Sequence, residues 1–386
     1  MVIDITRRKV VRDLRLVSVS KNKEAFMKIS GGRYALFTSI MLSIPILFSG
    51  TAIADDLPAT SSTKDTSMTL EQKWDKTFPQ SNKVNHQKVT FRNRYGITLA
   101  ADLYIPKQSS GKMAAIAVSG PFGAVKEQAS GLYAQTMAER GFLTLAFDPS
   151  FTGESGGQPR NVASPDINTE DFSAAVDYLT TRSDVDADRI GIIGICGFGG
   201  MGINAAAMDT RIKATVASTM YDMSRVTANG YFDSMDADAR YELRSKLNEQ
   251  RTKDAQSGTI ASAGGLPDKL SGNEPQFVKD YYDYYKTKRG YHPRSLNGGA
   301  GWNTTSALSF MTMPLLQYAG EIRNAVLLIH GEKAHSRYFS EDTFKKLTGD
   351  NKELMIIPNA SHVDLYDRMD IIPWDKMVTF FNTYLK

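Results

Sequence analysis

The stretch RIGIIGICGFGG, Arg189 to Gly200, decides the fold and holds the one cysteine of the chain. Its apolar run over residues 189–195 predicts a buried parallel strand. Glycines follow, and GGMGINAAAMD then predicts a helix. Cys196 therefore lies where a strand turns sharply into a helix, which is a position that can expose a nucleophile on a strained turn.

Cys196 has two interpretations. It is either a nucleophile whose thiolate is favoured by the helix N-terminus, or a small apolar residue of the core. Gly194 precedes it by two residues, where only a small residue lets the turn close, and the backbone N–H of Gly197 is placed to donate to an oxyanion. Phe198 departs from the usual motif, because glycine is common two residues after the nucleophile.

Ser155 is a competing nucleophile, because GESGG over residues 153–157 matches G-x-S-x-G. That motif requires a strand running directly into the glycine and a helix directly after the serine. Ser155 instead lies well past the apolar run over 142–148 and is followed by QPRN. We therefore interpret this glycine-rich loop as structural.

The rest of the chain alternates apolar runs with amphipathic segments, which predicts an α/β fold with a mostly parallel sheet and helices on both faces. The rhythm breaks over about 225–313, a polar segment rich in Gly, Tyr and Asp, which we interpret as an inserted helical cap. Its aromatic residues either line a pocket or pack the cap onto the core. The runs that predict strands lie at 88–93, 98–106, 113–120, 142–148, 189–195, 213–219, 325–330 and 354–358.

The first 54 residues have the features of a leader. From Met27, Lys28 and Arg33 precede an apolar region over 35–48, and Ala52-Ile53-Ala54 matches a signal-peptidase site. We therefore expect a signal peptide over 27–54, a linker over 55–84, a folded α/β domain over 85–386 and a periplasmic or extracellular location. An uncleaved membrane anchor is the alternative, although the apolar run is shorter than the ~20 residues of a spanning helix.

The leader also explains the basic charge of the chain. The whole chain has a formal charge of +4, but residues 1–54 hold nine Lys or Arg and three acidic side chains, so the remainder carries −2. The charge therefore does not indicate nucleic-acid binding. No metal-binding motif or P-loop is present, and GFGGMG over 197–202 lies at a later βα turn than a dinucleotide site requires. We expect a small-molecule substrate and no cofactor or metal, and the sequence sets no oligomeric state.

His362 is the candidate general base. It follows the apolar run over 354–358 after a short loop, which is the usual place of the histidine in the order nucleophile, acid, histidine. None of the other four histidines lies in that position.

These segments together resemble the α/β-hydrolase superfamily, and within it the dienelactone-hydrolase-related group with a cysteine at the nucleophile elbow. The resemblance rests on VSGPFGAVKEQ, GFLTLAFDPSFTGESGG, DRIGIIGICGFGGM, VLLIHGEKAHSRYFSED and IIPNASHVDLYD. It implies an oxyanion donor at Phe122 or Gly123 that works with the Gly197 N–H.

The acid of a catalytic triad is open at this point. The usual position after the penultimate strand holds Ala334, with His335 beside it, and Glu332 lies nearer the strand end than is usual. Asp222, after the run over 213–219, is the other option and is slightly favoured. A Cys–His pair without an acid is also workable, because a thiol needs less activation than a hydroxyl.

We expect an exported hydrolase that cleaves an ester, thioester or lactone bond, with Cys196 as nucleophile and His362 as base. The alternative is a catalytically inert protein of the same fold that binds a small ligand or a partner under its cap. Phe198 and the uncertain acid motivate that alternative.

The leader generates a direct prediction. Mass spectrometry of the exported protein should give an N-terminus at Asp55, because the small-x-small site ends at Ala54. An intact chain recovered from the membrane fraction would instead support the anchor.

Overall fold

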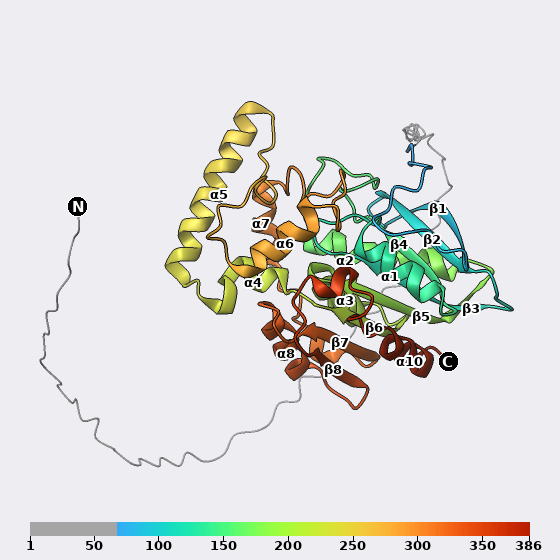
Figure 1. Ribbon diagram of the computed structural model, residues 1–386. Helices are drawn as coiled ribbons and strands as arrows, with labels where there is room; N and C mark the ends of the chain where they lie inside the picture. The colour runs from blue at the N-terminus through green and yellow to red at the C-terminus, as the bar shows by residue number, and fades with distance from the viewer. Residues whose placement is uncertain (1–67) are drawn as a thin grey trace, which may run out of the picture. The chain divides into compact units, whose positions relative to one another are not determined.

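The computed structural model describes residues 68–386, which form an eight-stranded sheet in the order β1-β2-β4-β3-β5-β6-β7-β8. The β1–β2 and β2–β4 pairs are antiparallel, and all pairs from β4 to β8 are parallel (Figure 1). The strands are β1 (Val84–Arg92), β2 (Thr98–Pro106), β3 (Met113–Ser119), β4 (Leu143–Phe147), β5 (Val185–Ile195), β6 (Ile212–Ser218), β7 (Ala325–Gly331) and β8 (Lys352–Ile357). Each strand predicted from the sequence is present.

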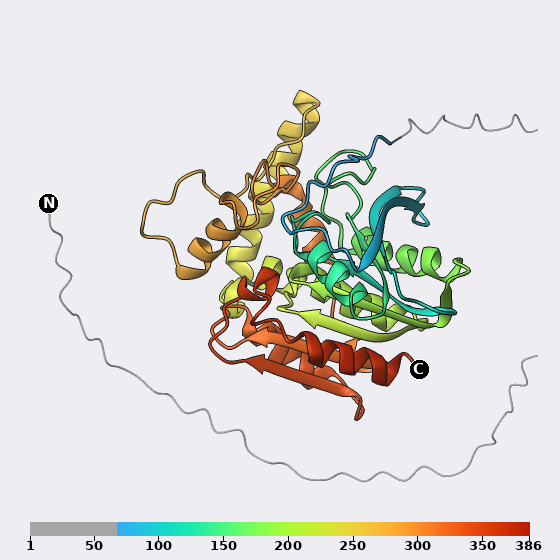
Figure 2. The ribbon, with the colours of Figure 1, turned by 45° about the vertical axis from the view of Figure 1, so that its right-hand side comes forward.

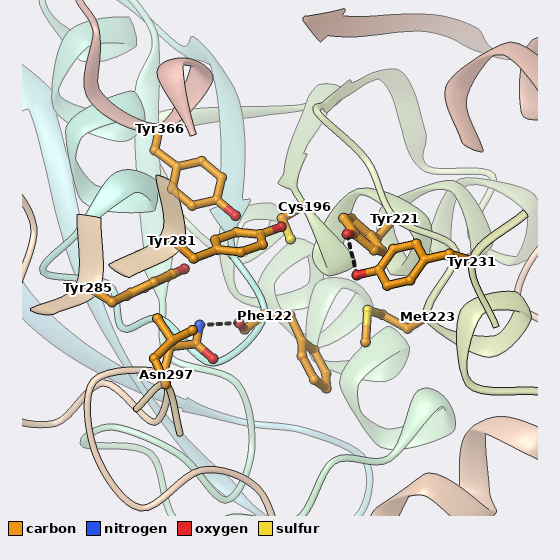
Figure 3. Close-up of a pocket in the computed structure, with 10 residues that line it drawn as sticks. Phe122, Cys196, Tyr221, Met223, Tyr231, Tyr281, Tyr285, Asn297 and Tyr366 are labelled. Atoms are coloured by element: carbon orange, nitrogen blue, oxygen red, sulfur yellow. Dashed lines mark hydrogen bonds between the residues drawn. The ribbon is translucent and has the colours of Figure 1, made fainter. Parts of the chain in front are cut away.

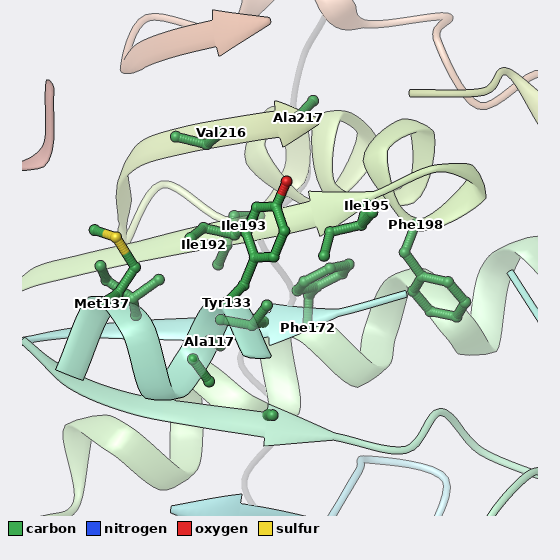
Figure 4. Packing of buried hydrophobic residues seen from close by; sticks show 14 of the residues in the cluster. Ala117, Tyr133, Met137, Phe172, Ile192, Ile193, Ile195, Phe198, Val216 and Ala217 are labelled. Carbon is green, nitrogen blue, oxygen red and sulfur yellow. The ribbon is translucent and has the colours of Figure 1, made fainter. Parts of the chain in front are cut away.

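Helices cover both faces of the sheet, which is why β3, β4 and β7 are buried along their whole length. Successive residues of β5 point to opposite faces: a Cβ on Gly191 would meet Phe381 of α10, whereas Ile192 lies beside α2 and α3. Figure 4 shows Tyr133, Phe172 and Phe198 among the buried side chains around β5 and β6. The helices are α1 (Ala129–Ala138), α2 (Pro165–Thr180), α3 (Gly197–Met208), α8 (Arg337–Lys346), α9 (Asp364–Asp367) and α10 (Trp374–Tyr384).

The predicted cap lies between β6 and β7 and is helical, which confirms the expected fold class. It sits at the end of the sheet toward which the parallel strands point (Figure 2), and this edge is where open α/β sheets bind ligands. Its α-helices are α4 (Met223–Asn229), α5 (Ala237–Ser257), α6 (Gln276–Lys286) and α7 (Ala307–Thr312). Three 3-10 turns accompany them: η1 (Tyr231–Asp233) after α4, η2 (Thr304–Ser306) before α7 and η3 (Ala319–Glu321) between α7 and β7.

The segment before β1 corrects the predicted linker over 55–84. Residues 55–67 lie outside the described residues, as does the whole leader. Farther along, Phe78 is buried, the Trp74 ring lies edge-on to it at 5.7 Å, and Lys76 forms an ion pair of 2.6 Å with the buried Asp102. This part therefore belongs to the folded domain, because its aromatic and charged side chains find partners on the sheet.

A buried charge cluster fastens the loop after β3. The Lys126 ammonium lies 2.6 Å from Glu127, 2.9 Å from Asp148 and 2.5 Å from Glu154. The three carboxylates are close enough together to hold a metal ion, but the ammonium occupies the space between them. Arg294 of the cap adds a contact of 2.9 Å to Glu127, so the cluster joins the cap to the sheet. These attractions hold the pKa of Lys126 above its usual value despite burial.

No helix among residues 68–386 combines the length and the apolar character that crossing a bilayer requires.

Candidate active site

Cys196 occupies a strained turn between β5 and α3. Its backbone has φ 57° and ψ −126°, which L-residues seldom adopt and which costs on the order of 1–3 kcal/mol. The turn can close because two of its neighbours are glycines. A Cβ on Gly194 would lie 2.2 Å from the Phe198 carbonyl oxygen, and a Cβ on Gly200 would lie 2.3 Å from the Tyr221 carbonyl oxygen. The small residue predicted at 194 is therefore a steric requirement.

Phe198, the departure from the usual motif, is accommodated in the core. Its side chain is fully buried and its ring lies 6.2 Å from that of Phe172 in α2. A Cβ on Gly120 would approach the Cβ of Phe198 to 2.9 Å, so the neighbouring loop leaves the space that a larger residue at 198 needs. The elbow is therefore complete without glycine at this position.

Cys196 is 7% exposed, and three polar groups lie against its thiol. The Tyr366 hydroxyl and the backbone N–H groups of Phe122 and Gly197 each interact with it and lower its pKa. Burial acts in the opposite direction and is the larger effect, so the pKa of Cys196 is raised. The thiolate expected from the helix N-terminus is therefore not the resting form, and the two predicted oxyanion donors lie beside the thiol.

Cap residues fix the loop that carries the Phe122 N–H. The Asn297 amide donates to the Phe122 carbonyl oxygen over 2.7 Å, and Ser295 Oγ and the Leu296 N–H donate to Gly123 over 2.9 and 2.8 Å. Gly123 has φ 82°, and a Cβ there would meet Asn297 at 2.5 Å. Gly123 is therefore needed because it has no side chain and can adopt a positive φ, whereas the N–H beside the thiol belongs to Phe122.

His362 is buried in the loop between β8 and α9, and its ring nitrogens face hydroxyl groups. Nε2 lies 3.0 Å from the Tyr366 hydroxyl, and Nδ1 lies 2.6 Å from Ser336 Oγ and 2.9 Å from Thr219 Oγ1. Burial holds the pKa of His362 well below its usual value. Tyr366 thus bridges the neutral imidazole and the Cys196 thiol.

Neither predicted acid contacts His362. Asp222 caps α4, where its Oδ1 accepts from the Arg225 N–H over 2.9 Å and from Ser224 Oγ. Glu332 is exposed, and its Oε2 accepts from the Asn359 N–H over 2.8 Å. Each carboxylate therefore accepts a hydrogen bond from a backbone N–H group away from His362. Within residues 68–386, the hydrogen-bond partners of His362 are all hydroxyls, so the two acid assignments are not supported by the geometry.

Ser336 occupies the place expected for the acid, in the loop between β7 and α8. Its Oγ also lies 2.9 Å from Nε2 of His330, whose Nδ1 lies 2.7 Å from Ser340 Oγ. Burial lowers the pKa of His330 to about 3, so this second imidazole is neutral. His362, Ser336, His330 and Ser340 thus form a series of hydrogen bonds in which the protons can be donated in either direction. When His362 Nδ1 donates to Ser336, and so on toward Ser340, Nε2 of His362 keeps a free lone pair.

The sequence analysis missed Tyr366, Ser336 and His330. Tyr366 follows His362 by four residues, the spacing of one helical turn, and this was the available signal. Ser336 and His330 belong to no recognisable motif, because the usual partner of the histidine at this strand end is a carboxylate.

Ser155 is structural, as its context predicts. It is buried, and its Oγ donates to the Asp148 carbonyl oxygen over 2.6 Å and accepts from the Ala100 N–H over 2.9 Å. These two bonds tie the glycine-rich loop to the sheet.

A pocket of about 180 Å³ opens in front of Cys196, between the sheet edge and the cap (Figure 3). Its walls are mostly aromatic, and the cap contributes Tyr231, Tyr281 and Tyr285 to them. The lining residues are Phe122, Cys196, Tyr221, Met223, Tyr231, Leu266, Tyr281, Tyr285, Asn297 and Tyr366.

Residues 95–364 match the family model of the X-Pro dipeptidyl-peptidase (S15) family. The chain belongs to this family. It is 61% identical over 329 residues to the uncharacterized protein PA2218 of Pseudomonas aeruginosa, covering 84% of this chain and 88% of that one. The crystal structure of PA2218 superposes with a TM-score of 0.80 and covers 82% of this chain and 99% of that chain.

Other relatives agree on the fold. The α/β hydrolase GrgF from Penicillium superposes with a TM-score of 0.63 at 18% identity, covering 78% of this chain and 99% of its own. A thiohydrolase of Eupenicillium brefeldianum is 34% identical over 131 residues, which is 34% of this chain and 42% of that protein. The chain is therefore an α/β hydrolase by fold and family. None of these matches names the dienelactone-hydrolase group, which stays a prediction.

The hydroxyl contacts of His362 generate a prediction about its positioning. Ser336→Ala should lower kcat by about tenfold with little change in KM, because Nδ1 loses its 2.6 Å partner. Asp222→Asn and Glu332→Gln should change kcat by less than about threefold, since neither contacts the imidazole. Steady-state kinetics on an ester substrate, at matched folded fractions, compares the three.

Ser336→Thr keeps a hydroxyl and serves as the conservative control, which should retain most of the activity. A tenfold loss in Asp222→Asn with no loss in Ser336→Ala would return the acid role to Asp222. Asp222→Asn should also cost about 1 kcal/mol of stability through the α4 cap, which is why the folded fraction is matched.

Proposed function

We propose that this chain is an exported hydrolase that cleaves an ester, thioester or lactone bond, with Cys196 as the nucleophile and His362 as the base. One observation carries the proposal. The thiol lies on a strained elbow at the floor of a pocket, beside the N–H groups of Phe122 and Gly197 and beside the Tyr366 hydroxyl. The pocket therefore brings together a nucleophile, two oxyanion donors and a hydroxyl that connects the thiol to a base.

The contacts suggest how the proton moves. As Sγ attacks the carbonyl carbon, its proton passes to the Tyr366 oxygen, and the Tyr366 hydroxyl proton passes to His362 Nε2. The carbonyl oxygen gains the negative charge and accepts from the Phe122 and Gly197 N–H groups. Collapse breaks the bond to the leaving group, which takes the proton back from His362 through Tyr366. Water then attacks the thioester by the same route and releases the acid and the free thiol.

A cysteine suits a base that lacks a carboxylate partner. A carboxylate on Nδ1 would stabilise the imidazolium formed during attack, whereas Ser336 and Thr219 offer only neutral hydroxyls. The imidazole is therefore a weak base, and a thiol gives up its proton more readily than a serine hydroxyl does. The thiohydrolase similarity adds support for a thioester among the three bond types.

Export rests on the leader sequence over 27–54, which lies outside the described residues. A secreted or periplasmic location is thus part of the proposal.

The alternative, a catalytically inert protein of the same fold, is favoured by the burial of both Cys196 and His362. Cys196 is buried with a raised pKa, and its base is buried and lacks a carboxylate partner among the described residues. A protein that only binds a ligand in this pocket would show the same features.

Substitution of the nucleophile tests the proposal. Cys196→Ala should abolish turnover of p-nitrophenyl esters and acyl thioesters while leaving the melting temperature within a few degrees, because the side chain adds little to the core. Cys196→Ser should retain less than about 1% of the activity, because the weak base must then deprotonate a hydroxyl. Undiminished turnover in Cys196→Ala would remove Cys196 as nucleophile.

Alkylation of the thiol against pH separates the enzyme from the inert protein. Because burial raises the pKa of Cys196 above its ordinary value, iodoacetamide labelling of the folded enzyme should be slow at pH 7 and rise only in the alkaline range. Tyr366→Phe should move this rise to higher pH, since the Tyr366 hydroxyl lowers that pKa. Mass spectrometry measures the labelling.

Circular dichroism at each pH confirms that the protein stays folded during labelling. Tyr241→Phe, at an exposed position on α5, is the matched control and should leave the profile unchanged. Labelling that appears only on unfolding, at every pH, would support the inert alternative.

A further inference from the structure

The pocket in front of Cys196 has no charged side chain in its lining. Of its ten lining residues, five are tyrosines and the others are Phe122, Cys196, Met223, Leu266 and Asn297. Among the carboxylates that directly adjoin lining residues in sequence, Asp222 caps α4, and Asp367 forms an ion pair of 2.7 Å with Arg289. A buried charge without a partner is costly, so a pocket with these walls disfavours a substrate group that carries one.

The tyrosines present neutral hydroxyl groups around the thiol. Burial raises the pKa of Tyr281, Tyr285 and Tyr366 well above the ordinary value, so these phenols keep their protons. Their hydroxyl groups point toward the part of the pocket where Cys196 lies (Figure 3). The walls thus offer aromatic faces and O–H donors.

The size of the pocket limits what can enter. Its volume is about 180 Å³, and an apolar cavity of about 150 Å³ is known to accommodate benzene. A single six-membered ring is therefore the scale of group that fits.

Tyr285 has a hydroxyl without a partner. It lies on α6, it is 1% exposed, and its hydroxyl makes no hydrogen bond to any of the residues that the structure describes. Its polar neighbours are the Asn297 amide and the Tyr366 hydroxyl. One N–H of that amide is donated to the Phe122 carbonyl oxygen, and the Tyr366 hydroxyl lies 3.0 Å from His362 Nε2. Buried hydroxyl groups are nearly always paired, so an unpaired one in a pocket wall suggests a partner on the ligand.

We propose that this pocket binds an uncharged, ring-sized substrate group, and that the Tyr285 hydroxyl donates a hydrogen bond to an acceptor oxygen on that group. The inference rests on the proposed function, because it places the substrate group beside Cys196. It also separates this chain from the activity in the family description. An enzyme that removes a dipeptide from a free N-terminus must accept an α-ammonium group, for which this pocket lining supplies no carboxylate.

Three matched probes test the proposal by calorimetric binding at pH 7: cyclohexanecarboxamide, the positional isomers of tetrahydropyran carboxamide, and piperidine-4-carboxamide, which is protonated. At least one tetrahydropyran isomer should bind about fivefold tighter than the carbocycle, the gain expected for one net hydrogen bond. Tyr285→Phe should bring that ratio close to one. Tyr241→Phe, on the exposed face of α5, should keep the ratio.

Two results would overturn the inference. One is a protonated piperidine that binds as tightly as the carbocycle. The other is a Tyr285→Phe variant that keeps the preference for the ring oxygen, or a wild type that has none for any isomer. Because these are binding measurements, they stand apart from the proposed function, which fails separately if the wild type hydrolyses no ester or thioester.

Discussion

The backbone of Cys196 is the constraint on which the rest of the site depends. A residue at φ 57° and ψ −126° is held there only if its neighbours leave no other conformation open. Gly194, Gly199 and Gly200 supply the space in which β5 meets α3, and the bulk of Phe198 is taken up by the loop at Gly120. That same loop continues into Phe122, so the fit that strains the elbow also brings the second N–H to the thiol.

The electrostatics of the site follow from burial more than from charge pairing. Cys196 and His362 are both deeply buried, and burial moves each pKa in the direction of the neutral form. A triad with a carboxylate would counter this effect at the imidazole, but Ser336 takes that place. The pair therefore starts as a neutral thiol and a neutral imidazole with a phenol between them, and charge appears only during the reaction that we propose.

The sequence predicted the fold well because its signals are local. An apolar run such as 189–195 and the glycines after it determine a strand and a turn without help from distant residues, and the elbow and His362 follow from their places on that frame. The acid could not be predicted in the same way. Asp222 and Glu332 lie at suitable strand ends. However, Asp222 accepts a hydrogen bond from the Arg225 N–H, and Glu332 accepts one from the Asn359 N–H. Tyr366 and Tyr285 reach the site through packing of α9 and the cap, which no local pattern encodes.

The buried Lys126 cluster has a consequence for how the chain folds. Its charges come from segments that are far apart in sequence: Glu127 follows β3, Asp148 and Glu154 follow β4, and Arg294 lies in the cap. Lys126 and Glu127 are costly to desolvate until all of these segments have docked. The cap therefore cannot behave as an independent module that unfolds while the sheet persists. Cap and sheet should instead melt together in a single cooperative transition.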